Sequence, residues 1–279
     1  MDTKYINLKF ISGNKTIEVG KGKPYRLLNI EGIEAGEMEL STADNVLYDG
    51  SKIRNRRIKF RPITIECEYT GRNKEEQRRF VAGFFNIHRG GTLQIDYMGV
   101  KREIPYEVEG YKSKLENIYT PYRFLVHLYC PEPFLLDIVE SSKEIVTWIG
   151  GMGFPLKLPT KFAMAGSRII NIINDGDVEA PLKIEIYGPA TNPKIILRET
   201  GEFLKINKTL TADDIVTITT EFGNKRVEKN GQNAFNILDL PDSTFFSLQV
   251  GDNVIEFTTE DVSNNANAKI SYRNRYLGV

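Results

Sequence analysis

The chain of 279 residues has only two histidines, two cysteines and one tryptophan. Two histidines cannot build a three-histidine metal site, and neither has a cysteine at ligand spacing, so the sequence argues against bound zinc. We expect His88 and His127 to pack or hydrogen-bond rather than catalyse. Cys67 and Cys130 lie in alternating, strand-like runs, which predicts two buried, reduced thiols rather than a disulfide.

Long apolar runs and an excess of one charge are also missing. No stretch approaches the roughly 18 uncharged apolar residues of a membrane span, and the first ten residues carry three charges in place of a signal peptide's apolar region. We therefore expect a protein made in a cytoplasm, with no membrane partner. Lys+Arg and Asp+Glu both total 37, which argues against a polyanion-binding protein and against sequence-specific nucleic acid as a partner.

Catalytic motifs are missing as well. No Gly-x-Ser-x-Gly sequence occurs. The glycines of residues 150–153 precede Phe154-Pro155 instead of a helix, and Gly20-Lys21-Gly22-Lys23 is typical of a hairpin turn. The acidic stretch Asn174-Asp175-Gly176-Asp177 could suggest Ca²⁺, but its spacing fits a tight turn better. We expect no enzyme, no catalytic residues, no metal site and no cofactor.

Short runs of alternating apolar and polar residues dominate the sequence, which predicts a mainly β protein. One of the expected strands is Ala234–Leu238. One segment, residues 73–89, has helical spacing with Asn73 as N-cap and Gly90-Gly91 after its end. A Gly/Pro-rich connector over residues 139–160 divides the chain. We expect a mainly β N-terminal domain with one α-helix over 1–138, and over 161–279 an all-β domain that fits an antiparallel sandwich or jelly roll.

Two neighbouring stretches carry opposite charge around a polar, turn-rich segment. The acidic stretch contains Glu31, Glu34, Glu37 and Glu39, and the basic stretch contains Lys52, Arg54, Arg56, Arg57, Lys59 and Arg61. The two stretches could pair across one hairpin, or they could form a projecting arm that meets a neighbouring subunit. In the second alternative, apolar residues such as Ile33, Met38 and Leu40 supply adhesion. The candidate interface residues are then Glu31, Glu34, Glu37, Glu39, Lys52, Arg54, Arg56 and Arg57. Binding of nucleic acid by the basic stretch is a third alternative, but Phe60 is the only aromatic residue there.

The order of these features resembles the distal tail protein (Dit) family, the baseplate hub of siphophages that infect Gram-positive hosts. The resemblance covers nearly the whole chain. It depends on an opening strand pair followed by these phrases in order: Tyr48-Asp49-Gly50, Arg56-Arg57-Ile58, the helix Glu75–His88, Thr92–Tyr97, Tyr122-Arg123-Phe124, Cys130–Phe134, Asn174–Asp177, Leu182–Gly188, Leu248–Asn253 and Ile270–Val279. A component of a contractile tail or of a phage-derived bacteriocin could have a similar order.

The resemblance implies a fold and a role. The first domain, residues 1–138, would be a β-sandwich with one helix and would form a homohexameric ring, and the C-terminal domain would be a galectin-like (jelly-roll) β-sandwich. The ring would join the tail tube protein to the tail-associated hub or fibre protein, and possible further partners are receptor-binding proteins. The protein would then be a structural component of the virion tail tip, assembled in the host cytoplasm, whether phage or prophage encoded.

An alternative role is a carbohydrate-binding protein for host adhesion that uses the C-terminal sandwich. Fold alone is a weak argument for such a function. Sugar sites commonly stack a ring on an exposed aromatic side chain, and the only tryptophan, Trp148, falls in the connector. Tyr187, Tyr272 and Tyr276 are more simply explained as residues of the sandwich.

Overall fold

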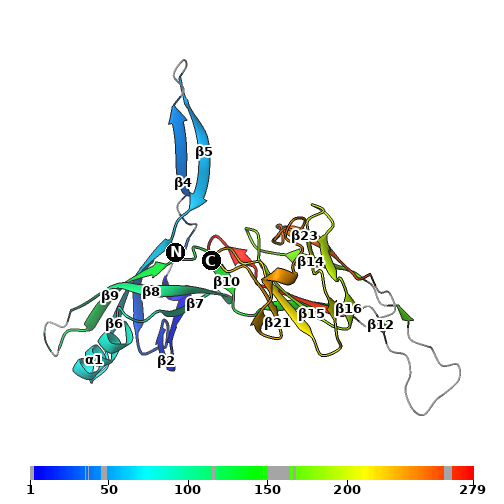
Figure 1. Cartoon of the computed structure of the whole chain (residues 1–279). Coiled ribbons are helices and arrows are strands. Elements are labelled where there is room, and N and C mark those ends of the chain that lie inside the picture. Colours follow the sequence, from blue (N-terminus) through cyan, green and yellow to red (C-terminus); the bar gives the residue numbers. More distant parts are fainter. Residues whose placement is uncertain are drawn as a thin grey trace, which may run out of the picture. The chain divides into compact units, whose positions relative to one another are not determined.

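The chain forms two compact units in a computed structural model that describes residues 3–34, 36, 38–44, 49–114, 117, 119–146, 148–149, 164–165, 168–260 and 266–279. The first unit comprises Met1–Ile138 together with Tyr276–Val279, and the second comprises Val139–Arg275 (Figure 1). Each unit has its own cluster of buried apolar side chains. The expected fold class, mainly β with a helix-bearing sandwich followed by a second sandwich, is confirmed.

The first unit is built on one bent sheet with the order β2-β1-β7-β8-β9-β6-β3. The long strand β8 pairs with β7 through residues 100–106 and with β9 through residues 107–114, and a bulge between Val108 and Gly110 separates the two halves. A bulge bends and twists a strand, so β8 belongs to both layers of the sandwich. The elements are η1 (Thr3–Tyr5), β1 (Ile6–Ser12), β2 (Lys15–Val19), β3 (Arg26–Glu31), β4 (Met38–Asp44), β5 (Ser51–Ile58), β6 (Arg61–Tyr69), α1 (Lys74–Phe84), β7 (Gly91–Tyr97), β8 (Val100–Lys114), β9 (Tyr122–Cys130) and β10 (Leu135–Asp137).

Helix α1 covers an aromatic core. Val81 and Phe84 are its buried residues, and Phe85, directly after it, is almost fully buried. The ring of Phe85 contacts those of Phe10, Phe84, Tyr111 and Phe124 at centroid distances of 5.0–6.2 Å. These contacts fix the end of the helix, because they draw Phe85 into the core.

The predicted helix over 73–89 is therefore too long at its C-terminal end. The observed helix ends at Phe84, and the amide of Phe85 donates to the Val81 carbonyl as the last helical hydrogen bond. Asn73 occupies the N-cap position, but its side chain makes no capping bond and instead donates to Glu76 Oε2 at 3.2 Å. The basic and glycine residues beyond Phe85 follow a turn, not a helix.

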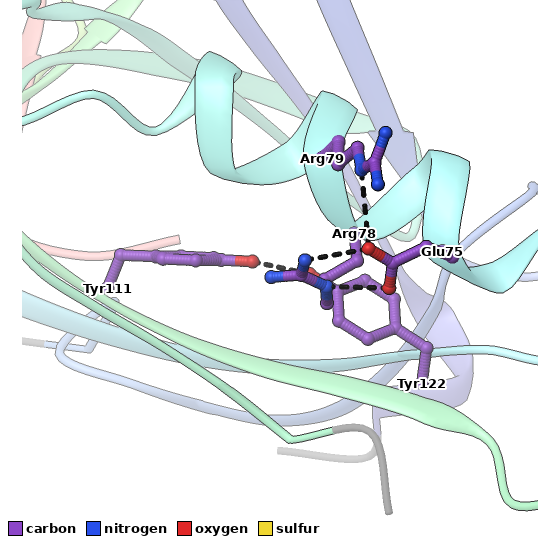
Figure 2. Close-up of polar contacts among 5 residues, drawn as sticks. All are labelled: Glu75, Arg78, Arg79, Tyr111 and Tyr122. Carbon is purple, nitrogen blue, oxygen red and sulfur yellow. Dashed lines mark hydrogen bonds and ion pairs between the residues drawn. The ribbon is translucent and has the colours of Figure 1, made fainter. Parts of the chain in front are cut away.

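Ion pairs join side chains within α1, and a hydrogen bond links the two strands beneath the helix (Figure 2). Glu75 pairs with Arg78 at 2.7 Å and with Arg79 at 3.3 Å, and its hydrogen bond from Arg78 lowers its pKa to about 2. The hydroxyl groups of Tyr111 and Tyr122 share a hydrogen bond below the helix. Burial raises the pKa of Tyr122, so this hydroxyl stays protonated at neutral pH.

The second unit is a β-sandwich of a six-stranded sheet, β11-β24-β15-β20-β21-β22, and a four-stranded sheet, β14-β23-β17-β18. The buried residues of both sheets form one core cluster. Its elements are β11 (Ser141–Val146), β12 (Trp148–Ile149), β13 (Met164–Ala165), β14 (Ile169–Asn174), β15 (Leu182–Tyr187), β16 (Ala190–Thr191), β17 (Lys194–Leu197), β18 (Phe203–Lys205), β19 (Thr209–Leu210), β20 (Ile215–Thr219), β21 (Arg226–Lys229), β22 (Gln232–Asn233), η2 (Phe235–Ile237), β23 (Gly251–Thr258) and β24 (Asn267–Tyr272). The last strand, β25 (Arg275–Tyr276), pairs with β10 in the sheet of the first unit.

The unit boundaries differ from the predicted domains at two places. Residues 141–146 of the expected connector form β11, which pairs with β24 inside the second sandwich. Tyr276–Val279 belongs to the first unit instead of the second. Most of the remaining connector, residues 150–160, lies outside the described residues. A strand expected over residues 234–238 is instead the 3-10 turn η2, because its side chains pack into the core at non-alternating positions.

The acidic turn after β14 is held by its asparagine. Asn174 is buried, and its Nδ2 donates to the carbonyl oxygens of Val178 at 3.0 Å and Leu248 at 3.2 Å. Its Oδ1 accepts from the Gly176 amide at 3.0 Å. The asparagine thus closes a turn. Within the described ranges, no three His, Cys, Asp or Glu side chains gather as a metal site would require, and no helix there is long and apolar enough to cross a membrane.

Candidate assembly surface

The hairpin formed by β4 and β5 is the most exposed regular structure of the first unit. Its two strands pair only with each other and extend away from the bent sheet (Figure 1). Every described residue of the two strands is exposed or only partly buried. An isolated two-stranded hairpin is marginally stable in water, so this hairpin is a candidate for burial against another protein surface.

One face of the hairpin carries an ion-pair network. Glu39 lies opposite Arg57 in the strand register, and its Oε2 is 2.8 Å from Arg57 Nε. Its Oε1 is 2.8 Å from Lys59 Nζ. The hydrogen bonds from Lys59 and Arg57 lower the pKa of Glu39. The charges of these three residues pair within the hairpin, as expected if the acidic and basic stretches pair across one hairpin.

The opposite face is apolar and basic. Met38 lies opposite Ile58, and Leu40 lies opposite Arg56. A register shift after Ser41 then brings Ile53 opposite Thr42, on the same face. Met38, Leu40 and Ile53 are 55%, 50% and 42% exposed. We call Met38, Leu40, Ile53 and Arg56 the apolar–arginine face.

The base of the hairpin borders a groove of about 590 Å³. Its apolar lining comes from Ile30, Ile33, Met38, Ile58, Phe60 and Pro62. Gly32 is required there, because its φ is +88° and a Cβ would lie 2.1 Å from the Pro62 carbonyl oxygen. The Phe60 ring stacks on Tyr129 at a centroid distance of 4.5 Å.

Arg61 fixes the chain that leads into the hairpin. Its side chain is 2% exposed, and Nη1 donates to the carbonyl oxygens of Glu34 at 3.1 Å and Gly32 at 3.4 Å. Burial lowers the pKa of the guanidinium group. The sequence placed Arg61 in the exposed basic stretch. The alternation Arg61, Ile63, Ile65 already indicated that it faces inward, together with the core residues of β6.

Seven of the eight predicted interface residues are described, and the structure separates them into three groups. Glu39 and Arg57 pair within the hairpin, whereas Lys52, Arg54 and Arg56 are exposed on β5 and form no ion pair with any described residue. Glu31 and Glu34 precede the hairpin, where Glu31 accepts a hydrogen bond from Asn29 at 3.0 Å, and Glu37 lies outside the described residues. Ile33, which we expected to supply adhesion with Met38 and Leu40, is only 2% exposed, so that expectation is wrong. Its side chain packs in the core of the first unit.

Replacing Glu39 with Gln is expected to loosen the hairpin at neutral pH. Because the pKa of Glu39 is lowered, its stabilising effect is present above the ordinary value of 4.5 and is lost as the pH falls through the lowered pKa. Amide hydrogen exchange of β4 and β5 should show lower protection in the variant at neutral pH, and the difference from the parent chain should vanish in acid. Glu31→Gln is the matched control. Equal protection of the parent and Glu39→Gln chains at neutral pH would contradict the expectation.

Comparisons with known proteins show what the chain is similar to. Residues 175–276 match the family model of the siphovirus-type tail component, C-terminal domain. A search of curated protein sequences gave no significant match. Among solved structures, the chain is similar to the Dit protein of phage SPP1, a hub of the adsorption apparatus in phages that infect Gram-positive bacteria, with a TM-score of 0.69 and 14% identity over 97% of this chain and 98% of that one.

Two structures of the phage P2 baseplate in its activated conformation are also similar. The form with Ca has a TM-score of 0.54 and 13% identity, covering 98% of this chain and 99% of that one. The form with Sr has a TM-score of 0.53 and 12% identity over the same shares. The resemblance that the sequence motifs indicated is therefore confirmed: the chain has the fold of siphophage distal tail proteins, and its second unit matches their C-terminal domain.

Proposed function

We propose that this chain is a structural hub of a phage baseplate, located at the virion tail tip. Its first unit forms a homohexameric ring that joins the tail tube protein to the tail-associated hub or fibre protein and to receptor-binding proteins. The observation that carries the proposal is the exposed apolar–arginine face on a hairpin that extends from a fold shared with known hub proteins.

A ring requires two different surfaces on each subunit, because its contacts are head-to-tail. We assign one of them to the apolar–arginine face, with Lys52 and Arg54 beside it. Its exposed apolar side chains supply adhesion, while its arginines set orientation, since exposed ion pairs contribute only about 0–1 kcal/mol each. Glu39 and Arg57 then serve the hairpin itself, and Glu31 and Glu34 remain proposed contacts at its base.

The two units act as separate domains in this proposal, the first in the ring and the second as an outward module joined through the connector. Each unit has a complete apolar core, as an independently folding domain needs. The role is structural, so no substrate or cofactor takes part. Assembly takes place in the host cytoplasm before the tail is completed.

The tyrosines weighed for sugar binding have other contacts. Tyr187 donates a hydrogen bond to Glu185 at 3.3 Å, and Tyr272 is buried and donates to the Ile173 carbonyl at 3.2 Å. The Tyr276 ring lies beneath Arg102. The side chain of Trp148 lies outside the described residues. These contacts favour the structural role over a carbohydrate-binding one.

The mass of the assembled protein tests the proposal. Light scattering of the full chain should give about 191 kDa, six times 31.8 kDa, and negative-stain images should show rings with a central opening. If the free chain is smaller, adding the tail tube protein should produce the ring. A chain that forms no ring at high concentration, with or without that partner, would contradict the proposal.

A further inference from the structure

The segment Tyr276–Val279 returns to the first unit after the whole second unit has been completed. We call it the return segment. Tyr276 and Val279 pack against the core of the first unit. The Arg102 guanidinium lies 3.5 Å from the centre of the Tyr276 ring, and Arg102 also pairs with Asp137 at 2.8 Å. The Tyr276 hydroxyl donates to the same carboxylate at 3.4 Å.

Arg61 joins the return segment to the base of the hairpin. Its Nη2 donates to the Leu277 carbonyl at 2.5 Å, while its Nη1 donates to the carbonyl oxygens of Gly32 and Glu34. No carboxylate pairs with Arg61 among the described residues, and its Nε is buried without a partner. A buried cation is costly unless its donors are satisfied. Losing the Leu277 carbonyl would therefore leave a second buried donor unpaired.

One cysteine lies next to the Arg61–Leu277 contact, and the other lies further along the same pair of strands. Cys130 is opposite Arg61 in the register of β6 and β9. It is fully buried, and burial raises its pKa to about 12. Cys67 is also fully buried, but it is opposite Phe124, six positions further along β6. The two thiols, the only ones in the chain, thus report on opening near Arg61 and away from it.

We propose that Arg61 and Arg102 form a binding site for the return segment, and that its occupancy holds the hairpin base in the conformation used for assembly. The second half of this statement rests on the proposed ring. The guanidinium of Arg61 is the shared element: it binds the return segment with one nitrogen and the chain entering β4 with the other. Release of the segment opens the region around Cys130 and loosens residues 32–34.

Thiol labelling of the free protein under native conditions tests the binding site without any ring. Two variants are compared with the parent: a chain that stops after Arg275, and Arg61→Lys, which keeps the charge but loses the second nitrogen. Leu277→Ala is the control, because Leu277 meets Arg61 through its backbone carbonyl. Mass spectrometry of the digested protein separates Cys130 from Cys67.

Both variants should label Cys130 roughly ten- to a hundredfold faster than the parent, the effect of losing a hydrogen bond to a charged group, while Cys67 is unchanged. Leu277→Ala should label as the parent does. Unchanged Cys130 rates in both variants would overturn the binding site, and so would equal acceleration of both thiols, which indicates global unfolding. Rings that form normally from a chain with selectively exposed Cys130 would overturn only the link to assembly.

Discussion

Reversing both Arg54 and Arg56 to Glu is expected to abolish ring assembly while leaving the monomer folded. Both side chains are exposed, and neither forms an ion pair with a described residue, so the reversal breaks no ion pair within the described part of the monomer. At a subunit interface the reversal replaces two cations with two anions, and like charges brought together cost roughly several kcal/mol. Light scattering and negative-stain images should show monomers at concentrations where the parent chain forms rings.

A charge swap within the hairpin is the matched control for this variant. Exchanging the residues at the Glu39–Arg57 pair, as Glu39→Arg with Arg57→Glu, keeps an opposite-charge pair on the polar face and the same net charge, and it removes only the exposed pair between Glu39 and Lys59. Assembly should survive this exchange. Arg57 is left out of the charge-reversal variant for the same reason: its reversal would break a bond inside the hairpin. Intact rings from the Arg54/Arg56 variant at the parental concentration would place the interface elsewhere.

Replacing Phe85 with Ala is expected to destabilise the first unit by about 3–5 kcal/mol, the usual cost of truncating a buried phenylalanine. Phe85 is 1% exposed and contacts four other aromatic rings. Because each unit has its own core, the second unit should keep its melting temperature. Calorimetry should therefore show one transition moved to lower temperature and one unchanged.

The control for Phe85→Ala is Phe222→Ala. Phe222 is 92% exposed, and substitutions at such surface positions usually change the free energy of unfolding by no more than about 0.5 kcal/mol. A single transition that moves as a whole in the Phe85 variant would contradict two independently folding units. It would also contradict the domain organisation proposed above.

The end of the helix shows where the sequence pattern was insufficient. Phe80, Phe84 and His88 have helical spacing, and Arg89-Gly90-Gly91 is typical of a helix end. The helix nevertheless ends at Phe84, because Phe85 packs among rings from β1, β8 and β9. Those rings are distant in sequence, so the local pattern carried no information about them.

The sequence by itself determined the strands and the direction of their side chains. Alternation with a period of two places Ile6, Leu8 and Phe10 on the buried face of β1. It also separated the acidic stretch from the basic one. These properties depend only on neighbouring residues, which is why they can be predicted from a single sequence.

Only the tertiary structure decided which charges pair and which stay exposed. The register of β4 and β5 places Glu39 opposite Arg57, and a slip of one residue would have put it on the other face. The bond from Arg61 to the Leu277 carbonyl joins residues 216 positions apart. Such contacts form because the packed core brings distant segments together, and no local pattern in the sequence encodes that proximity.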